Sequence, residues 1–174
     1  MSEAKYASHL PVLKLLYQIK PYDHVLEFGS GMFSTKYFVS ICRSIVSLEN
    51  EKVEWFNKMT EEIGTFHTHF NYKFLPYQES VDWFNSITDK FDFIFVDGGI
   101  REQCLNASFG RAPTIAIHDR GMRSWRKGLF LTVGGKEYTA FVVGLAMPNT
   151  TVFSVDLDVI DALSSNTNCV RIKR

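Results

Sequence analysis

Four short polar clusters follow apolar runs, and their residue types could bind a ligand or move a proton. The clusters are Glu27-Phe28-Gly29-Ser30-Gly31, Glu49-Asn50, Asp97-Gly98 and His118-Asp119. Glycines let a ligand lie against bare backbone, and a carboxylate at a strand end can hold ribose hydroxyls or a substrate. A histidine can remove a proton from an acceptor hydroxyl, since its ordinary pKa is near neutrality. These clusters therefore indicate a binding site that also carries acid–base groups.

The first cluster lies where a predicted strand turns into a predicted helix. The run from His24 to Leu26 is typical of a buried parallel strand, and helical spacing begins after Gly31. A helix that starts on glycines presents free backbone N–H groups. The next apolar strand ends in Glu49, 18 positions after Gly31. That spacing is close to the one at which an acid binds the ribose of a nucleotide.

This stretch resembles motifs I and II of the class I S-adenosylmethionine (SAM)-dependent methyltransferases, in which an acid precedes Gly-x-Gly and a second acid ends the next strand. The matching residues are Glu27, Gly29, Gly31 and Glu49. A nicotinamide-binding fingerprint would carry a third glycine at position 34, where this chain has Ser34. The missing glycine counts against a nicotinamide dehydrogenase.

The resemblance implies SAM as the cofactor and a set of residues that bind it. Glu27 and the glycine loop would hold the methionine part, and Glu49 the ribose. Gln78 follows the third predicted strand, where the family often reaches the adenine, although a solvated loop is the alternative. The full set of predicted cofactor-binding residues is Glu27, Gly29, Ser30, Gly31, Glu49, Asn50, Gln78, Asp97 and Gly98.

Asp97 ends a strand so apolar that a carboxylate there needs a reason. It could be the N-cap of the following helix, or it could be the family's motif IV, at the methionine end of SAM or at the substrate. Many small-molecule methyltransferases of similar sequence carry a histidine where this chain has Arg101. The catalytic base therefore stays open. His118 would remove the hydroxyl proton, or it would be a structural histidine at the strand end, and Asp119 would orient His118 or bind the substrate. The predicted catalytic residues are His118, Asp97 and Asp119.

Asp97 and Asp119 are similar to the divalent-metal carboxylates of catechol-type O-methyltransferases, so a metal site has to be considered. Those enzymes have Asp-Asn after the fifth strand, and this chain has Asp119-Arg120. We therefore predict no required metal. His9 is expected to pack in the core. His67 and His69 have a metal-like spacing, but no third ligand is evident near them in the sequence.

The alternation of predicted strands and helices indicates an α/β protein with a doubly wound sheet. The resemblance implies a seven-stranded, mostly parallel sheet with helices on both faces. We predict helices over residues 3–19, 34–42, 51–63, 80–87, 101–109 and 137–147, with Ser80 as an N-cap. In the last of these segments, Val142 and Val143 would also suit a strand. The remaining strands are expected at 68–75, 91–99 and 114–117, and at 151–155 and 169–172 as a last antiparallel pair.

Composition narrows the class of protein. The chain has 174 residues, of which 45% are hydrophobic, enough for one domain with a sizeable core. We predict a single SAM-binding domain over residues 1–174, with a helix within 1–20 packed on it. Lys plus Arg equals Asp plus Glu at 19 each, which argues against a nucleic-acid partner. With no signal peptide, no membrane-length apolar run and three scattered cysteines, the sequence favours the cytoplasm.

The leading hypothesis is methyl transfer from SAM to the hydroxyl of a small molecule. The Arg-rich segment after the fifth strand suggests an anionic acceptor held by Arg120 or Arg123. Methyltransferases that act on nucleic-acid bases commonly carry Asn/Asp-Pro-Pro after the fourth strand, unlike the sequence at Asp97. A SAM-binding protein without methyl transfer, either a regulatory subunit or a SAM-degrading enzyme, is the alternative. The oligomeric state stays open, and a homodimer is compatible with the sequence.

Overall fold

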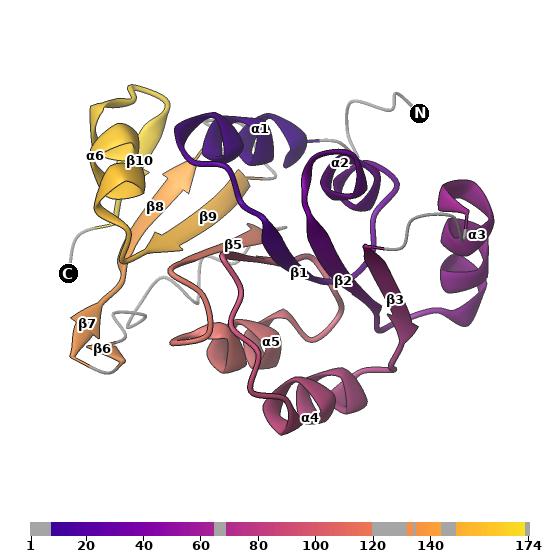
Figure 1. Ribbon diagram of the computed structural model, residues 1–174. Helices are drawn as coiled ribbons and strands as arrows, with labels where there is room; N and C mark the ends of the chain where they lie inside the picture. Colours follow the sequence, from indigo (N-terminus) through magenta and orange to yellow (C-terminus); the bar gives the residue numbers. More distant parts are fainter. Residues whose placement is uncertain (1–7, 65–68, 120–131, 134, 144–148, 173–174) are drawn as a thin grey trace.

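The computed structural model describes residues 8–64, 69–119, 132–133, 135–143 and 149–172. One eight-stranded sheet runs through the molecule in the order β10-β8-β9-β5-β4-β1-β2-β3 (Figure 1). Helices cover both of its faces, which confirms the predicted doubly wound α/β class. The strand count is eight, not the predicted seven, because β10 extends the sheet beyond β8.

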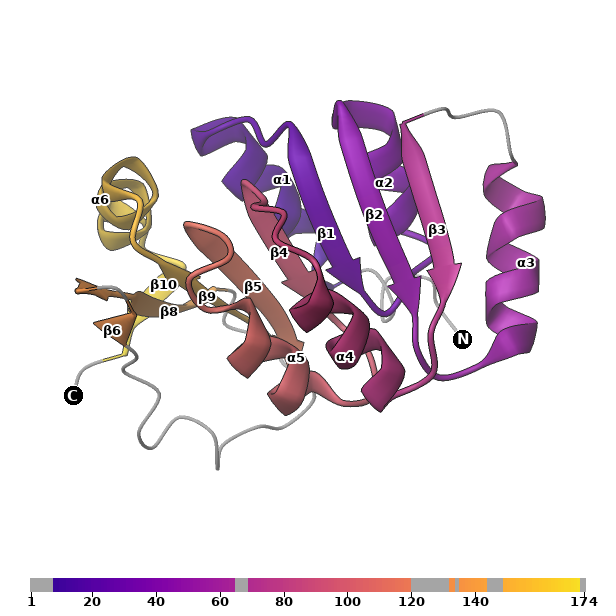
Figure 2. The same cartoon turned by 60° about the horizontal axis from the view of Figure 1, so that its bottom comes forward.

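The first five strands form the parallel half of the sheet. They are β1 (His24–Phe28), β2 (Ser44–Glu49), β3 (Phe70–Phe74), β4 (Phe93–Val96) and β5 (Thr114–Asp119). The first strand, β1, pairs with β2 on one side and with β4 on the other, so the chain order reverses there. The arrowheads of β1, β2 and β3 point to the same edge of the sheet in Figure 2. Ligands of open α/β sheets bind at that carboxyl edge, beside the point of reversal.

The other half of the sheet is antiparallel. Its strands are β8 (Thr139–Val143), β9 (Asn149–Ser154) and β10 (Cys169–Arg171), and a separate two-stranded ribbon joins β6 (Thr132–Val133) to β7 (Lys136–Glu137). The last two predicted strands are confirmed, but their pairing is wrong, because β8 lies between β9 and β10.

The predicted helix over residues 137–147 is wrong. Residues 136–143 form β7 and β8, and 144–148 lie outside the described residues. Phe141 and Val143 face one core and Ala140 faces the other, which is the alternation of a strand buried on both faces. A short apolar run gives similar periodicity for a buried helix and a buried strand, so the two β-branched valines were the better indicator.

The described part of the chain contains six helices, of which the first precedes β1. They are α1 (Leu10–Ile19), α2 (Ser34–Ile41), α3 (Val53–Ile63), α4 (Gln78–Ser86), α5 (Arg101–Ser108) and α6 (Leu157–Ser165). Figure 2 shows α1 and α2 on one face of the sheet and α4 and α5 on the other. None of the helices in the described ranges is long and apolar enough to span a bilayer.

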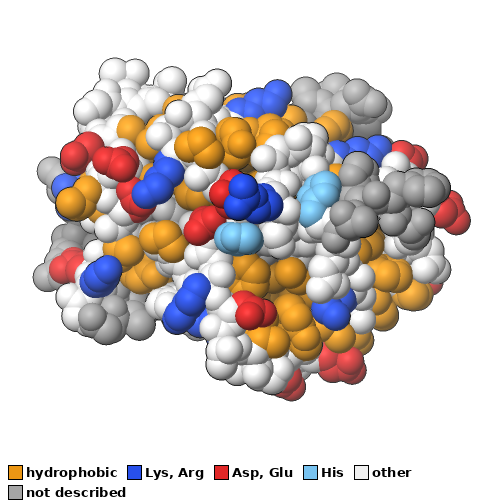
Figure 3. All heavy atoms as spheres, viewed as in Figure 1, with side chains coloured by type: hydrophobic (Ala, Val, Ile, Leu, Met, Phe, Trp, Pro, Cys, Tyr) orange, Lys and Arg blue, Asp and Glu red, His pale blue; other side chains and the backbone are white. Residues whose placement is uncertain are grey.

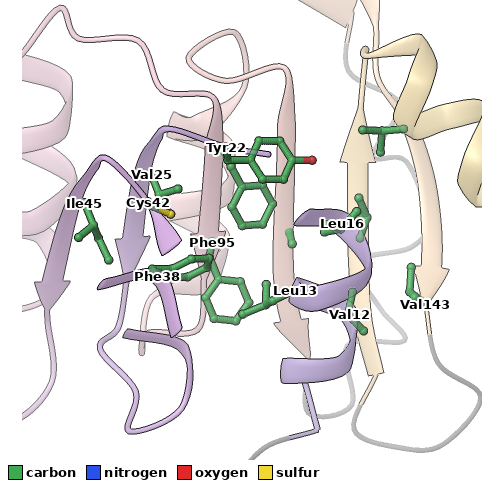
Figure 4. Close-up of a cluster of buried hydrophobic side chains, with 14 of the residues drawn as sticks. Val12, Leu13, Leu16, Tyr22, Val25, Phe38, Cys42, Ile45, Phe95 and Val143 are labelled. Carbon is green, nitrogen blue, oxygen red and sulfur yellow. The ribbon is translucent and has the colours of Figure 1, made fainter. Parts of the chain in front are cut away.

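Each face of the sheet packs its own apolar core, because alternate strand residues point to opposite faces. On one face, Val25 and Phe95 of the sheet pack with Leu13 and Leu16 of α1 and with Phe38 of α2 (Figure 4). On the other face, a second cluster joins the sheet to α4 and α5; it includes Leu26, Phe28, Ile94, Phe84 and Leu105. The carboxyl edge of the sheet is therefore supported from both sides.

Two helix predictions differ from the structure in detail, and one helix was missed. Within the described residues the first helix begins at Leu10 and holds Pro11 in its first turn, where a missing N–H costs little. Ser80 is not an N-cap, since α4 begins at Gln78 and the Ser80 hydroxyl donates to the carbonyl of Tyr77. The sixth helix, α6, was not predicted.

Candidate functional site

The predicted glycine loop meets the end of β4 at the point where the strand order reverses. Gly29 has φ +85°, and a Cβ there would lie 2.5 Å from the Cα of Gly98. Backbone N–H groups of Gly29 and Asp97 donate to Leu48 and Phe28 at 2.7 Å each. Position 29 therefore requires glycine twice, for its left-handed conformation and for the close approach of the neighbouring loop. Gly31 does not adopt a positive φ.

Glu27 is a buried carboxyl group that ties the glycine loop to α2. It has no exposed surface, and its Oε2 accepts hydrogen bonds from Thr35 Oγ1 and Ser47 Oγ, each at 2.6 Å. The Thr35 hydroxyl also accepts from the backbone N–H of Gly31. Burial raises the pKa of Glu27 to about 7, although the hydroxyls of Ser34, Ser47 and Thr35 favour its charged form. Oε1 has no hydrogen-bond partner of ordinary geometry among the described residues.

Glu49 contacts the glycine loop through Ser30. The Ser30 hydroxyl donates to Oε2 of Glu49 at 2.7 Å, and the backbone N–H groups of Glu51 and Lys52 donate to Oε1 at 2.9 and 3.1 Å. The Tyr72 hydroxyl lies 2.6 Å from the same Ser30 oxygen. A carboxylate offers about four acceptor positions, so three donors leave about one for a ligand hydroxyl unless Ser30 moves. We call Glu27, Ser30 and Glu49 the glycine-loop end of the site.

Asn50 lies under the loop that follows β4. It is fully buried, and its Oδ1 accepts from the backbone N–H of Gly99 at 3.3 Å. Its Nδ2 has no partner among the described residues, and a Cβ on Gly98 would lie 2.6 Å from that nitrogen. Position 98 therefore requires glycine, because a Cβ there would overlap the side-chain amide of Asn50.

Tyr77 is a residue of this region that the sequence reasoning missed. Its φ is 39°, a left-handed value that is rare outside glycine, and its backbone N–H donates to the carbonyl of Asn50. The Tyr77 side chain is 52% exposed beside the rim. The predicted Gln78 begins α4, and its side-chain amide donates to Asp82 at 2.9 Å. Pro76 before Tyr77 was the sequence signal for a tight turn there.

Arg101 holds the ends of β4 and β5 together. Its Nη2 donates to Oδ1 of Asp97 at 2.7 Å and to the Asp97 carbonyl at 3.2 Å, while its Nε donates to the carbonyl of His118 at 2.9 Å. The N-cap residue of α5 is Ile100, so the alternative role of Asp97 as that cap is wrong. The arginine instead fixes the Asp97 carboxylate at the rim.

His9, Asp97 and His118 lie together, and we call them the histidine end of the site. Nδ1 of His9 is 3.9 Å from Oδ2 of Asp97, and the rings of His9 and His118 are 4.9 Å apart, edge to face. His118 is 6% exposed; Thr150 Oγ1 lies 3.3 Å from its Nδ1, and Ser8 Oγ lies 3.4 Å from its Nε2. The structure therefore brings two predicted catalytic residues together and adds His9.

His9 is predicted from the sequence as a core residue, and the structure places it both in the core and at the site. It is 3% exposed and packs against Phe95, and burial lowers its pKa to about 4. The ring is therefore neutral near pH 7. His69 differs, since it lies directly before β3 with its Nε2 3.0 Å from the Val39 carbonyl.

The remaining predicted residues lie apart from the rim or outside the described residues. Arg111 donates to the carbonyls of Phe84, Ile87 and Asp89, so it fastens α4 to β5 rather than facing a ligand at the rim. A shallow groove beside it, lined partly by Lys90 and Tyr138, lies at the opposite edge of the sheet. Asp119 is the last residue of β5. Arg120, Arg123, Arg126 and Trp125, together with His67, lie outside the described residues.

The fold of the chain is similar to solved structures, although no protein-family model and no curated protein matches its sequence. A caffeoyl-CoA O-methyltransferase-like protein from Staphylococcus aureus is 14% identical over 84% of this chain and 83% of that one, with a TM-score of 0.62. The N-methyltransferase NodS from Bradyrhizobium japonicum is 13% identical over 84% and 92%, with a TM-score of 0.57. An rRNA methylase from Streptococcus thermophilus is 9% identical over 82% and 93%, with a TM-score of 0.56.

These likenesses, at identities of 9% to 14%, concern the fold. The three neighbours are described as acting on different kinds of acceptor, so they do not distinguish a small molecule from RNA. In this chain the parallel order of β3, β2, β1, β4 and β5 is followed by antiparallel β9. The chain has the Rossmann-like fold of the class I methyltransferases.

Proposed function

We propose that this protein transfers a methyl group from SAM to the hydroxyl of a small molecule. The observation that carries the proposal is the contact between the glycine loop and Glu49 at the reversal point of a methyltransferase-like sheet. In sheets of this kind a nucleotide binds at that place, with its ribose on the acid at the end of the second strand. The four polar clusters of the sequence supply the chemistry of the site.

Two buried polar atoms support binding of a polar cofactor at the glycine-loop end. Oε1 of Glu27 and Nδ2 of Asn50 lack hydrogen-bond partners among the described residues. An unpartnered buried polar atom costs about 1 to 3 kcal/mol, so a ligand that supplies partners is favoured. We assign Glu27 and the glycine loop to the methionine part, Glu49 to the ribose, and Asn50 and Gly98 to the space between them. Bound SAM would supply the methyl group and a sulfur leaving group.

The histidine end would serve the acceptor. We assign His118 as the base that takes the hydroxyl proton. Thr150 lies near its Nδ1, and Ser8 lies 3.4 Å from its Nε2. We assign Nε2 as the nitrogen that receives the proton. Asp97, held by Arg101, would orient the acceptor or the methionine part of SAM. Asp119 follows His118 directly and is the alternative for either role.

Charge supports a small-molecule acceptor over nucleic acid. Basic and acidic side chains balance at 19 each, whereas a nucleic-acid surface gathers basic residues on one face. On the face drawn in Figure 3, side chains of both signs are interspersed with apolar ones. We propose an anionic acceptor held by Arg120 or Arg123, because Arg101 and Arg111 are already engaged with Asp97 and with backbone carbonyls. The free cysteines Cys42, Cys104 and Cys169 fit a cytoplasmic protein.

A SAM-binding protein without methyl transfer is the second candidate. The observation that favours it is the burial of the proposed base, since His118 is 6% exposed and is approached by both Ser8 and His9. An acceptor could reach His118 only if the segment before α1 moved. Retained SAM binding with no methyl transfer to any hydroxyl, amine or carboxylate acceptor would support this candidate.

Thermal unfolding with SAM, S-adenosylhomocysteine or NAD tests the cofactor. A ligand that binds only the folded state stabilises it by about 2.7 kcal/mol at a hundredfold excess over its dissociation constant. We expect a shift with both adenosyl compounds and not with NAD. Glu49→Gln should lose most of the shift, because the amide has one acceptor oxygen in place of two and leaves no acceptor position for a ribose hydroxyl. Glu62→Gln, on the exposed face of α3, is the matched control. No shift with either adenosyl compound would overturn the proposed function.

A further inference from the structure

The histidine end contains the donor set of a metal site. One ligand atom from each of His9, Asp97 and His118 lies within 4.8 Å of the others. The three residues come from separate parts of the chain: the turn before α1, the residue after β4, and β5. Two imidazoles and one carboxylate on one side of an ion are the ligands of many zinc and non-haem iron sites, which keep further positions open.

His9 provides the strongest indication that this cluster binds a ligand. Both of its ring nitrogens are buried, and neither has a hydrogen-bond partner among the described residues. Buried polar atoms without partners are rare in native proteins, because they lose their hydrogen bonds to water on folding. A metal ion would satisfy one nitrogen. Metals bind a neutral imidazole through such a nitrogen.

The other two residues have the supporting contacts that metal ligands usually have. Metal-binding histidines commonly hold a polar group on their second nitrogen, and metal-binding carboxylates are themselves hydrogen-bonded. Thr150 lies 3.3 Å from Nδ1 of His118, and Arg101 donates to Oδ1 of Asp97. The other carboxylate oxygen, Oδ2, is the one that faces His9 at 3.9 Å. The contacts thus fix the orientation of both side chains.

We propose that His9, Asp97 and His118 bind a divalent transition-metal ion such as zinc. The two imidazoles select against magnesium and calcium, which prefer oxygen ligands. Bond lengths of about 2.1 Å place neighbouring ligand atoms roughly 3 to 3.5 Å apart, so the cluster must contract slightly around the ion. The positive charge of Arg101 opposes the ion and limits its affinity. This proposal replaces the sequence prediction of no metal.

The ligand set differs from the Asp97 and Asp119 pair considered from the sequence, because it uses nitrogen atoms and the segment before α1. A metal at this place would occupy the nitrogen of His118 that otherwise serves as the base, and it would take over that role. It would leave coordination positions for a water or an acceptor oxygen and make that oxygen more acidic. This catalytic role rests on the proposed function. Binding of the ion does not, and it is therefore tested without SAM.

The test uses the untagged full-length protein, stripped of metal with a chelator that is then removed. Zn²⁺ is titrated against a chromophoric competitor, and Co²⁺ is titrated while its visible absorption is recorded. We expect one equivalent of each ion and a cobalt spectrum typical of low-symmetry nitrogen and oxygen ligation. His9→Phe should weaken Zn²⁺ binding at least about 100-fold, since losing a ligand costs no less than losing an outer-shell partner. Phenylalanine suits the apolar contact of His9 with Phe95.

Two matched variants control for binding elsewhere. His24→Gln changes an exposed histidine at the start of β1, and the double variant His67→Gln/His69→Gln removes the pair with metal-like spacing. Both should keep one equivalent of zinc. Paramagnetically shifted NMR signals from two imidazoles in the cobalt-loaded natural sequence keep the test valid if His9→Phe fails to fold.

Three results would overturn the metal site: less than one equivalent of Zn²⁺ in the natural sequence, unchanged binding in His9→Phe, or loss of binding in the His67/His69 double variant. In each case His9 would be a core histidine. A SAM-induced thermal shift on the same preparation separates the outcomes, because it depends on the glycine-loop end. Failure of the metal test with an intact SAM shift would leave the proposed function standing.

Discussion

The two ends of the candidate site differ in how their polar groups are partnered. At the glycine-loop end, the hydrogen bonds to Glu27 and Glu49 are 2.6 to 3.1 Å long and join the loop, β2 and α2. At the histidine end, the contacts of the rings are longer, at 3.3 Å to Thr150, 3.4 Å to Ser8 and 3.9 Å between His9 and Asp97. The first end is organised before a ligand arrives. At the second end, the two rings are held by these longer contacts.

The largest effect should come from Gly29→Ala, at the centre of the organised end. A Cβ would overlap the backbone of Gly98, and the left-handed φ adds strain of its own, so we expect a loss of at least about 3 kcal/mol in the free energy of unfolding. Urea unfolding measures it. Gly135→Ala is the matched control, since Gly135 has φ +77° with open space around it and should lose about 1 kcal/mol. Equal losses in the two variants would show that the close approach of the loops at Gly29 and Gly98 does not contribute to the effect.

The next effect is the pH dependence that Glu27 gives to stability. Its pKa is raised from 4.5 to about 7, so the folded state binds this proton more tightly than the unfolded state does. The resulting stability is complete below about pH 4.5 and is lost as the pH rises through about 7, a change of about 3 kcal/mol. The free energy of unfolding in urea should be measured from pH 5 to 8 for the natural sequence and for Glu27→Gln. The difference between the two proteins isolates this change, because the contributions of the other titrating groups cancel. A difference that grows in the opposite direction would mean that Glu27 is charged when folded.

The glycine-loop end was predictable because each of its parts is local in sequence. Glu27, Gly29 and Glu49 follow apolar runs that fold as strands whatever surrounds them, and parallel strands bring their carboxyl ends to one edge. Helix α6 also had a local signal, which was missed: Asp156 accepts from the backbone N–H of Asp158, and Val159 and Leu163 are buried at helical spacing.

The histidine end could not be predicted in the same way. His9 contacts Asp97 and His118 only because α1 crosses the sheet, and nothing in the sequence around His9 specifies that path. Tyr77 shows the same limit, since its left-handed φ depends on the hydrogen bond from its N–H to Asn50 in another loop. Strand β8 was mistaken for a helix because its neighbours β9 and β10 come later in the chain and decide its conformation.

A moderate effect should follow from Ser30→Ala, which removes the link between the glycine loop and Glu49. The Ser30 hydroxyl donates to a nearly buried carboxylate and contacts the Tyr72 hydroxyl, so its loss should cost about 2 kcal/mol in urea unfolding. Ser40→Ala, whose exposed hydroxyl donates to the Tyr37 carbonyl, should cost less than about 0.5 kcal/mol. Similar small losses in both variants would mean that this end is not held together by the Ser30 contact.

The smallest effect should come from Thr150→Val at the histidine end. Thr150 and Glu49 are both buried. Valine has nearly the shape of threonine, so the substitution removes a hydroxyl and little else. Because that hydroxyl lies 3.3 Å from Nδ1 of His118, at the long limit of a hydrogen bond, we expect a loss of about 0.5 kcal/mol or less in metal-free protein. A loss as large as that of Ser30→Ala would show that both ends are equally organised. An imidazole that binds a metal donates more strongly from its other nitrogen. If the loss for Thr150→Val is small in metal-free protein and larger once Zn²⁺ is added, the contact between Thr150 and His118 tightens only around a bound ion.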